Sequence, residues 1–167
     1  MSLAEAAAEA AGLAERGDER PLADLRARWE DELEASARSA DFRERAVAYR
    51  AIGQFRWRQK VELLRRGLDD QSPACRGSAL MSVELLSRDH PGIVNGLRSL
   101  LHTLLNSDGN EAVRRLAGLC LANGSPHRDT IVLLDHLAAD DDMSVELRAV
   151  AKRVAGSLKK KAGPTTR

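Results

Sequence analysis

The chain has 167 residues, of which 43% are hydrophobic and only 3% aromatic, and its formal net charge is +1. This length suits one domain or about four helix-pair repeats, and the scarcity of aromatic residues disfavours a β-sheet core. A net charge near zero gives no general indication of a nucleic-acid or membrane partner.

Helix-start and helix-stop signals recur along the chain. Ser2 is a suitable cap for a first helix that ends at Gly17, and Pro21 suits the first turn of a second helix. Asp41 with Glu44 three residues later resembles a capping box for a third helix. We expect further helices at residues 57–68, 73–88, 91–106, 110–122, 126–139 and 143–160. The short connections between them predict antiparallel neighbours.

An arginine followed three residues later by an alanine recurs in four places. The four pairs are Arg43–Ala46, Arg76–Ala79, Arg114–Ala117 and Arg148–Ala151. Each arginine follows an apolar residue, and six residues before the last three stands an aspartate: Asp70, Asp108 and Asp142. The first pair departs from this pattern, with Ala37 in place of the aspartate. This periodicity predicts repeated helix pairs.

The pattern resembles the first helix of a HEAT repeat, in its short phycobilisome-lyase-type form, over about residues 41–160. The resemblance implies an all-α fold, a right-handed α-α superhelix of antiparallel helix pairs like those of HEAT and armadillo proteins. Residues 1–40 would form an N-terminal helical pair, as a degenerate capping repeat, and residues 161–167 a disordered tail. The resemblance also implies a structural ladder in which the repeat aspartates accept hydrogen bonds from backbone N–H and guanidinium groups.

The sequence lacks the motifs of common catalytic and cofactor sites, such as a glycine-rich phosphate loop, a paired CxxC or an HExxH helix. We therefore expect no enzyme activity, no cofactor and no metal. His102 and His136 stand at equivalent repeat positions, six residues before an aspartate. They would form either a two-ligand metal contact or pH-sensitive patch, or simply two solvent-facing polar residues, which is the interpretation we prefer.

The segment Phe55–Arg58 alternates aromatic and basic residues, and Lys60, Arg65 and Arg66 follow. This combination can stack nucleic-acid bases and neutralise phosphates. The alternative, which we prefer, is that Phe55 and Trp57 cover a helix–helix turn.

The preferred functional prediction is a non-catalytic scaffold or adaptor that binds a partner protein or peptide. In HEAT-like proteins the second helix of each pair generally lines the concave side, and here those helices carry mixed charge, which suits a protein partner. The candidate binding residues are Arg58, Arg65, Asn95, Arg98, His102, Arg128, Asp135 and His136. A nucleic-acid-binding module that uses the Phe55–Arg58 and Arg65 region is one alternative. An accessory or lyase-like factor, suggested by the name of the repeat family, is another.

Two further expectations concern the surroundings of the protein. Cys75 and Cys120 lie in apolar helical runs, which predicts buried free thiols and a reducing compartment. Glutamates interrupt the alanine-rich N-terminus, so it does not resemble a signal peptide, and no apolar run is long enough to span a bilayer. We therefore expect a cytoplasmic protein without a membrane partner.

Overall fold

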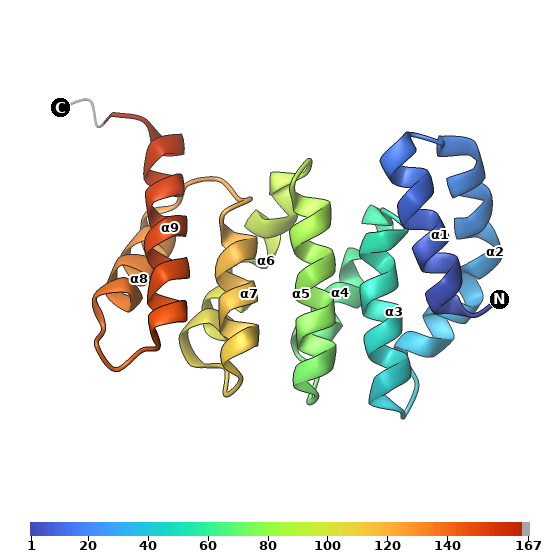
Figure 1. Cartoon of the computed structure of the whole chain (residues 1–167), viewed down its shortest axis with the longest axis horizontal. Coiled ribbons are helices and arrows are strands. Elements are labelled where there is room, and N and C mark those ends of the chain that lie inside the picture. Colours follow the sequence, from blue (N-terminus) through green and yellow to red (C-terminus); the bar gives the residue numbers. More distant parts are fainter. Residues whose placement is uncertain (165–167) are drawn as a thin grey trace. The chain divides into compact units, whose positions relative to one another are not determined.

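The computed structural model describes residues 1–164 and is helical throughout, with no β-strand in that range (Figure 1). The helices are α1 (Leu3–Arg16), α2 (Glu19–Ala37), α3 (Phe42–Gln54), the 3-10 helix η1 (Arg58–Lys60), α4 (Val61–Leu68), α5 (Pro73–Ser87), α6 (Pro91–Ser107), α7 (Glu111–Leu121), α8 (Arg128–Ala139) and α9 (Val145–Ala162). The all-α prediction is confirmed. None of these helices combines the length and apolar character needed to cross a lipid bilayer.

Local capping signals account for several helix ends. Ser2 and Glu5 form a reciprocal capping box at the start of α1, and Gly17 adopts a left-handed conformation, with φ of 74°, at its end. The capping box predicted at Asp41 is wrong in part. The Asp41 carboxylate caps α3 by accepting from the Arg43 N–H, but the Asp41 N–H donates to Ser39 Oγ and not to Glu44.

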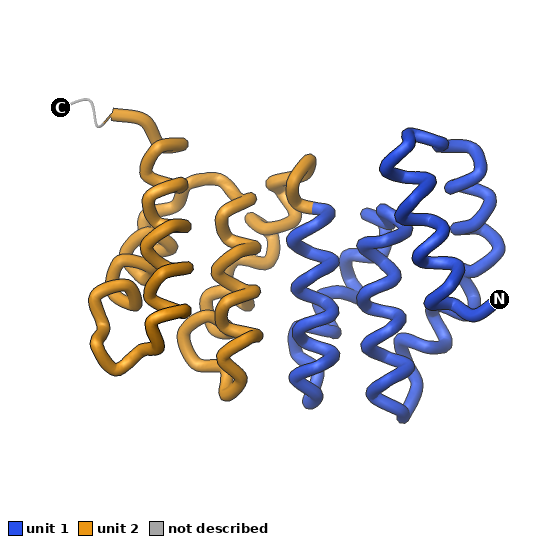
Figure 2. The backbone as a smooth tube through the Cα atoms, viewed as in Figure 1, with its two compact units in different colours: residues 1–86 blue, residues 87–167 orange. Residues whose placement is uncertain are grey.

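The chain divides into two compact units, residues 1–86 and residues 87–167 (Figure 2). In unit 1, α1 and α2 pack against each other and both pack against α3, so residues 1–40 are docked on the segment that follows them. In unit 2, α6 packs on α7 and α8 packs on α9, while α7 also lies against α9 and α6 against α8. Each unit therefore hides its apolar faces by packing neighbouring helices together.

Small residues let the helices of unit 1 approach closely. The Gly53 N–H of α3 donates to Ser82 Oγ of α5 over 2.9 Å, and a Cβ built on Gly53 would lie only 2.7 Å from that oxygen. A Cβ on Gly67 of α4 would lie 2.8 Å from the Ala79 Cβ. Larger residues at these glycines would force the helices apart.

Four helices share one local register, which corrects the predicted repeat. Arg45, Arg76, Arg114 and Arg148 each follow an N-cap residue by four positions and donate their backbone N–H to its carbonyl. The alanine three residues after each of them is fully buried.

The first predicted pair, Arg43–Ala46, is wrong by two residues. Arg43 is exposed beside the Phe42 ring, whereas Arg45 and Ala48 occupy the repeated positions. The arginine–alanine spacing occurs twice here, and the N-cap at Asp41 decides which copy faces inward.

The end of α9 also differs from the prediction. Lys161 and Ala162 belong to its last turn, and Lys161 Nζ donates to the Ala122 carbonyl. The last three residues of the predicted disordered tail, 165–167, lie outside the described part of the chain.

Candidate functional site

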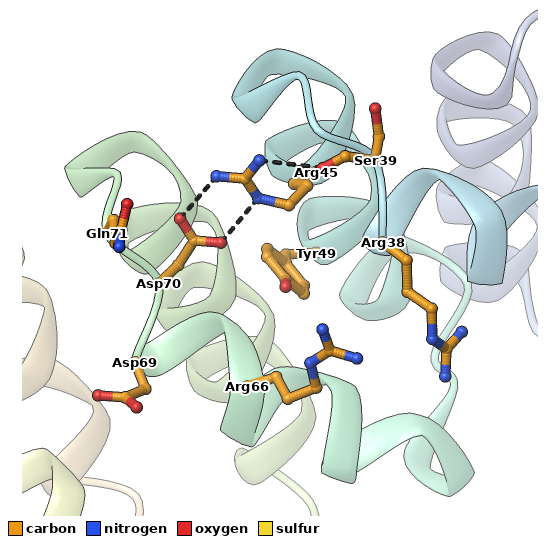
Figure 3. A pocket seen from close by; sticks show the side chains of 8 residues that line it. All are labelled: Arg38, Ser39, Arg45, Tyr49, Arg66, Asp69, Asp70 and Gln71. Carbon is orange, nitrogen blue, oxygen red and sulfur yellow. Dashed lines mark hydrogen bonds and ion pairs between the residues drawn. The ribbon is translucent and has the colours of Figure 1, made fainter.

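A pocket of about 480 Å³ opens on unit 1 where α2 meets α3 and α4 meets α5 (Figure 3). Its lining residues are Arg38, Ser39, Arg45, Tyr49, Arg66, Asp69, Asp70 and Gln71. One side is built around a two-bond ion pair. Arg45 Nε and Nη2 donate to the two oxygens of Asp70 over 2.9 and 3.0 Å, and the Asp70 side chain is only 8% exposed.

The Arg45–Asp70 pair connects the loop between α2 and α3 to the loop between α4 and α5. Asp70 also accepts from the Ser72 N–H at 2.9 Å, and Arg45 also donates to the Ser39 and Ala40 carbonyls. Burial alone would raise the pKa of Asp70, but the hydrogen bonds from Arg45 and Ser72 outweigh it and lower the pKa. The implied structural role of Asp70 therefore fits the geometry, with Arg45 as its guanidinium partner.

In the loop between α8 and α9, the aspartate that accepts a backbone hydrogen bond is not the one that the repeat pattern implies. The Asp142 N–H donates to Asp140 Oδ1 at 2.9 Å, so Asp140 and not Asp142 accepts the backbone hydrogen bond. Arg148 lies 3.7 Å from Asp141. Three consecutive aspartates left this register open in the sequence, and the N-cap at Ser144 fixes it.

The other side of the unit 1 pocket carries two more arginines and a tyrosine. Tyr49 is buried, and its hydroxyl donates to the Ala37 carbonyl over a long 3.4 Å. Arg38 pairs with Glu34 at 2.5 Å, and the Arg66 guanidinium points toward the Tyr49 hydroxyl (Figure 3). Three guanidinium groups thus border the pocket.

The candidate residue Arg65 does not line this pocket. Arg65 Nε lies 3.3 Å from Glu62 on the same helix, whereas its neighbour Arg66 reaches the pocket. Gly67 packs against the Tyr49 ring, which brings the end of α4 to this position. No local sequence signal distinguishes residue 66 from residue 65 in this respect.

The aromatic residues of the Phe55–Arg58 segment are part of the core. Phe55 is fully buried and Trp57 is 6% exposed, and their rings meet edge to face with centroids 5.8 Å apart. Arg56 between them has a left-handed φ of 53° and donates its side chain to the Gly53 carbonyl. Arg26 covers this turn by donating to the carbonyls of Phe55 and Arg56. The segment therefore offers no exposed aromatic surface on which a base could stack.

The cationic side chains near this turn differ in their surroundings. Lys60 Nζ lies 2.6 Å from Glu30, 2.7 Å from Glu34 and 5.0 Å from the centre of the Trp57 ring. The candidate residue Arg58 is exposed. The Lys60 charge is thus already neutralised within the protein.

In unit 2, the candidate residues Asn95 and Arg98 belong to one polar network. Arg98 Nη2 donates to Asn95 Oδ1 over 2.7 Å, and the same oxygen accepts from the Ser125 N–H over 3.0 Å. Asn95 Nδ2 in turn donates to Ser125 Oγ over 3.0 Å. These bonds attach α6 to the turn before α8 and hold both side chains in fixed orientations.

His102, one helical turn beyond Arg98, makes a separate contact with α8. Its Nε2 is hydrogen-bonded to Thr130 Oγ1 of α8 at 2.7 Å. Burial lowers the pKa of His102, and the neighbouring Arg98 and His127 lower it further, so the ring is neutral at pH 7. The described contacts do not join His102 to His136, which is exposed on α8. Within residues 1–164 no group of three His, Cys, Asp or Glu side chains is arranged to hold a metal ion.

The two remaining candidate residues lie on α8. Arg128 is exposed at its first turn, and Asp135 accepts from Lys159 of α9 at 2.9 Å. Asn95, Arg98 and His102 are thus brought together with Ser125 and Thr130, while Asp135 is engaged with α9.

Both cysteines are buried and free of disulfides. Burial raises the pKa of Cys75, whose Sγ lies 3.2 Å from the Phe42 carbonyl. The Cys75 thiol is therefore protonated at neutral pH and is not an activated nucleophile.

No protein-family model matches this sequence, and a search of curated proteins found no match either.

Proposed function

We propose that the chain is a non-catalytic interaction module that binds a partner protein or peptide through its second helices. The observation that carries the proposal is the row of polar side chains on α6, where Asn95 and Arg98 are hydrogen-bonded in one network and His102 is held separately by Thr130. Its hydrogen bonds fix polar side chains before any partner arrives, which lowers the entropy cost of binding. Its mixture of amide, guanidinium and imidazole groups suits a protein surface better than a uniform phosphate backbone.

The proposal includes the HEAT-like fold, a right-handed superhelix of helix pairs. The shared register of Arg45, Arg76, Arg114 and Arg148 supports it, because equivalent positions on successive helices are typical of repeats. A cytoplasmic location belongs to the same proposal and is supported by two free buried cysteines.

The test uses charge reversal at Arg98, a half-buried residue of the network. Tagged wild type, Arg98→Glu and the control Arg153→Glu are compared in co-purification with quantitative mass spectrometry. Arg153 is an exposed α9 residue for which the described contacts include no partner. We expect a protein that the wild type and Arg153→Glu both retain, and at least a tenfold lower recovery with Arg98→Glu. Equal recovery with all three, or a nucleic acid as the retained partner, would contradict the proposal.

A further inference from the structure

A second surface of unit 1 has the features of a binding groove. It runs along one face of α3, whose lining residues recur at spacings of three and four: Arg43, Ala46, Val47, Arg50 and Gln54. Two depressions of about 520 and 290 Å³ share Ala4 and Val47 and so form one continuous groove. The start of α1 borders both depressions, and Ser78 of α5 borders the smaller one. In unit 1 these three helices run alongside one another (Figure 1).

The middle of the groove is small and apolar. Ala4 and Ala46 leave room for a chain to approach the helix backbones, and the Val47 side chain is 38% exposed between them.

One end of the groove holds a guanidinium group with an unmet hydrogen bond. Arg50 is half-buried, and its Nη1 is shielded from solvent without a hydrogen-bond partner among residues 1–164. Burial lowers the pKa of Arg50, Arg56 lowers it further, and Glu84 opposes both. A half-buried guanidinium is costly in the free protein, and a carboxylate placed against its accessible part best compensates that cost.

The other end has the opposite charge. Glu32 and Glu44 border the larger depression with a single basic residue, Arg43, between them. Glu44 and Arg50 are six residues apart on α3, about 9 Å along the helix axis. The groove thus presents a negative end, an apolar middle and a positive end.

We propose that this groove binds a short extended segment of a partner protein, with an acidic side chain at Arg50 and a basic side chain at Glu32 and Glu44. At about 3.3 Å per extended residue, the two charges of the segment lie about three residues apart. Small or apolar residues between them cover Ala46 and Val47. This surface uses first helices, so the inference goes beyond the α6 network.

The test measures the binding of acetylated, amidated hexapeptides to the full chain by fluorescence anisotropy. In each peptide, an aspartate and a lysine are separated by two residues, and these two residues are leucine and alanine. We expect saturable binding that weakens at least tenfold when asparagine replaces the aspartate of the peptide. Arg50→Gln should weaken binding to a similar extent. The matched control Arg28→Gln, an exposed α2 position in the same unit, should stay within twofold of wild type. Absence of binding by the wild type, or equal binding by Arg50→Gln, would overturn the proposal.

A second variant separates recognition from folding. Arg50→Met keeps the aliphatic bulk and removes the unpaired charge, so it should unfold at the same or a higher temperature than wild type while losing peptide binding. A lower unfolding temperature would assign Arg50 to the fold and overturn the proposal. Sedimentation that shows a dimer of the wild type and a monomer of Arg50→Gln would identify the occupant as a second copy of the chain, and would also overturn it.

Discussion

The close approach of α3 and α5 makes Gly53→Ala the sharpest test of the packing. The added Cβ would lie 2.7 Å from Ser82 Oγ and 2.8 Å from Ser82 Cα. Carbon atoms in contact prefer about 3.5–4.0 Å, so α5 must move away by roughly 1 Å. Because Cα is backbone, a side-chain rotation cannot relieve this clash.

The expected loss of stability combines three effects. Overpacking costs about 1–3 kcal/mol, and stretching the hydrogen bond from the Gly53 N–H to Ser82 Oγ costs about 1 kcal/mol more. The higher helix propensity of alanine returns about 1 kcal/mol. We therefore expect a net destabilisation of about 1–3 kcal/mol, equivalent to roughly 2–12 °C in the unfolding midpoint for a chain of this size.

The assay is thermal and urea unfolding followed by circular dichroism, with Gly156→Ala as control. Gly156 is an exposed α9 residue, and a Cβ there would meet no neighbouring atom within 4 Å, so this variant should gain about 0.5–1 kcal/mol. If Gly53→Ala unfolds at or above the wild-type midpoint, the proposed packing of α3 on α5 is incorrect.

Two further predictions concern Asp70 and the thiols. Because hydrogen bonds hold the pKa of Asp70 below its ordinary value of 3.8, its carboxylate stabilises the fold fully above that pH and loses this contribution as pH falls through the lower folded value. Asp70→Asn should therefore lower the unfolding midpoint at pH 7, and this loss should shrink as the pH falls below 3.8 towards the lower folded value; a loss that stays constant over that range would contradict the ion pair with Arg45. Cys75 and Cys120 are fully buried, so a thiol reagent should modify neither in the native protein and both in urea, and rapid modification of the native protein would contradict their burial.

The helices and some of their ends could be predicted from the sequence because the responsible interactions are local. The Ser2 hydroxyl reaches a backbone N–H three residues away, and Gly17 takes a conformation that other residues avoid, so neither depends on the rest of the chain. Leu22, Leu25, Trp29 and Leu33 of α2 recur at spacings of three and four, which places them on one helix face, and all four are buried. Such signals determine helix number and type, and the structure agrees with both.

The phase of the repeat was predicted only in part. At Arg76, Arg114 and Arg148 the predicted arginine is the one at the repeated structural position. In α3 the same spacing occurs twice, as Arg43–Ala46 and as Arg45–Ala48. The choice depends on which alanine faces the neighbouring helices, and spacing alone does not contain that information.

Only the tertiary structure decided which distant residues share a site. Arg45 and Asp70 are 25 residues apart, and Arg98 and Ser125 are 27 apart, so their contacts depend on the packing of whole helices. One nitrogen of Arg50 is buried for the same reason, since the packing of neighbouring helices covers this polar side chain. The sequence by itself thus determined the helices and much of the apolar core, through interactions within a few residues. The packing of those helices determined the pocket, the polar network and the groove, because each of them joins side chains from different helices.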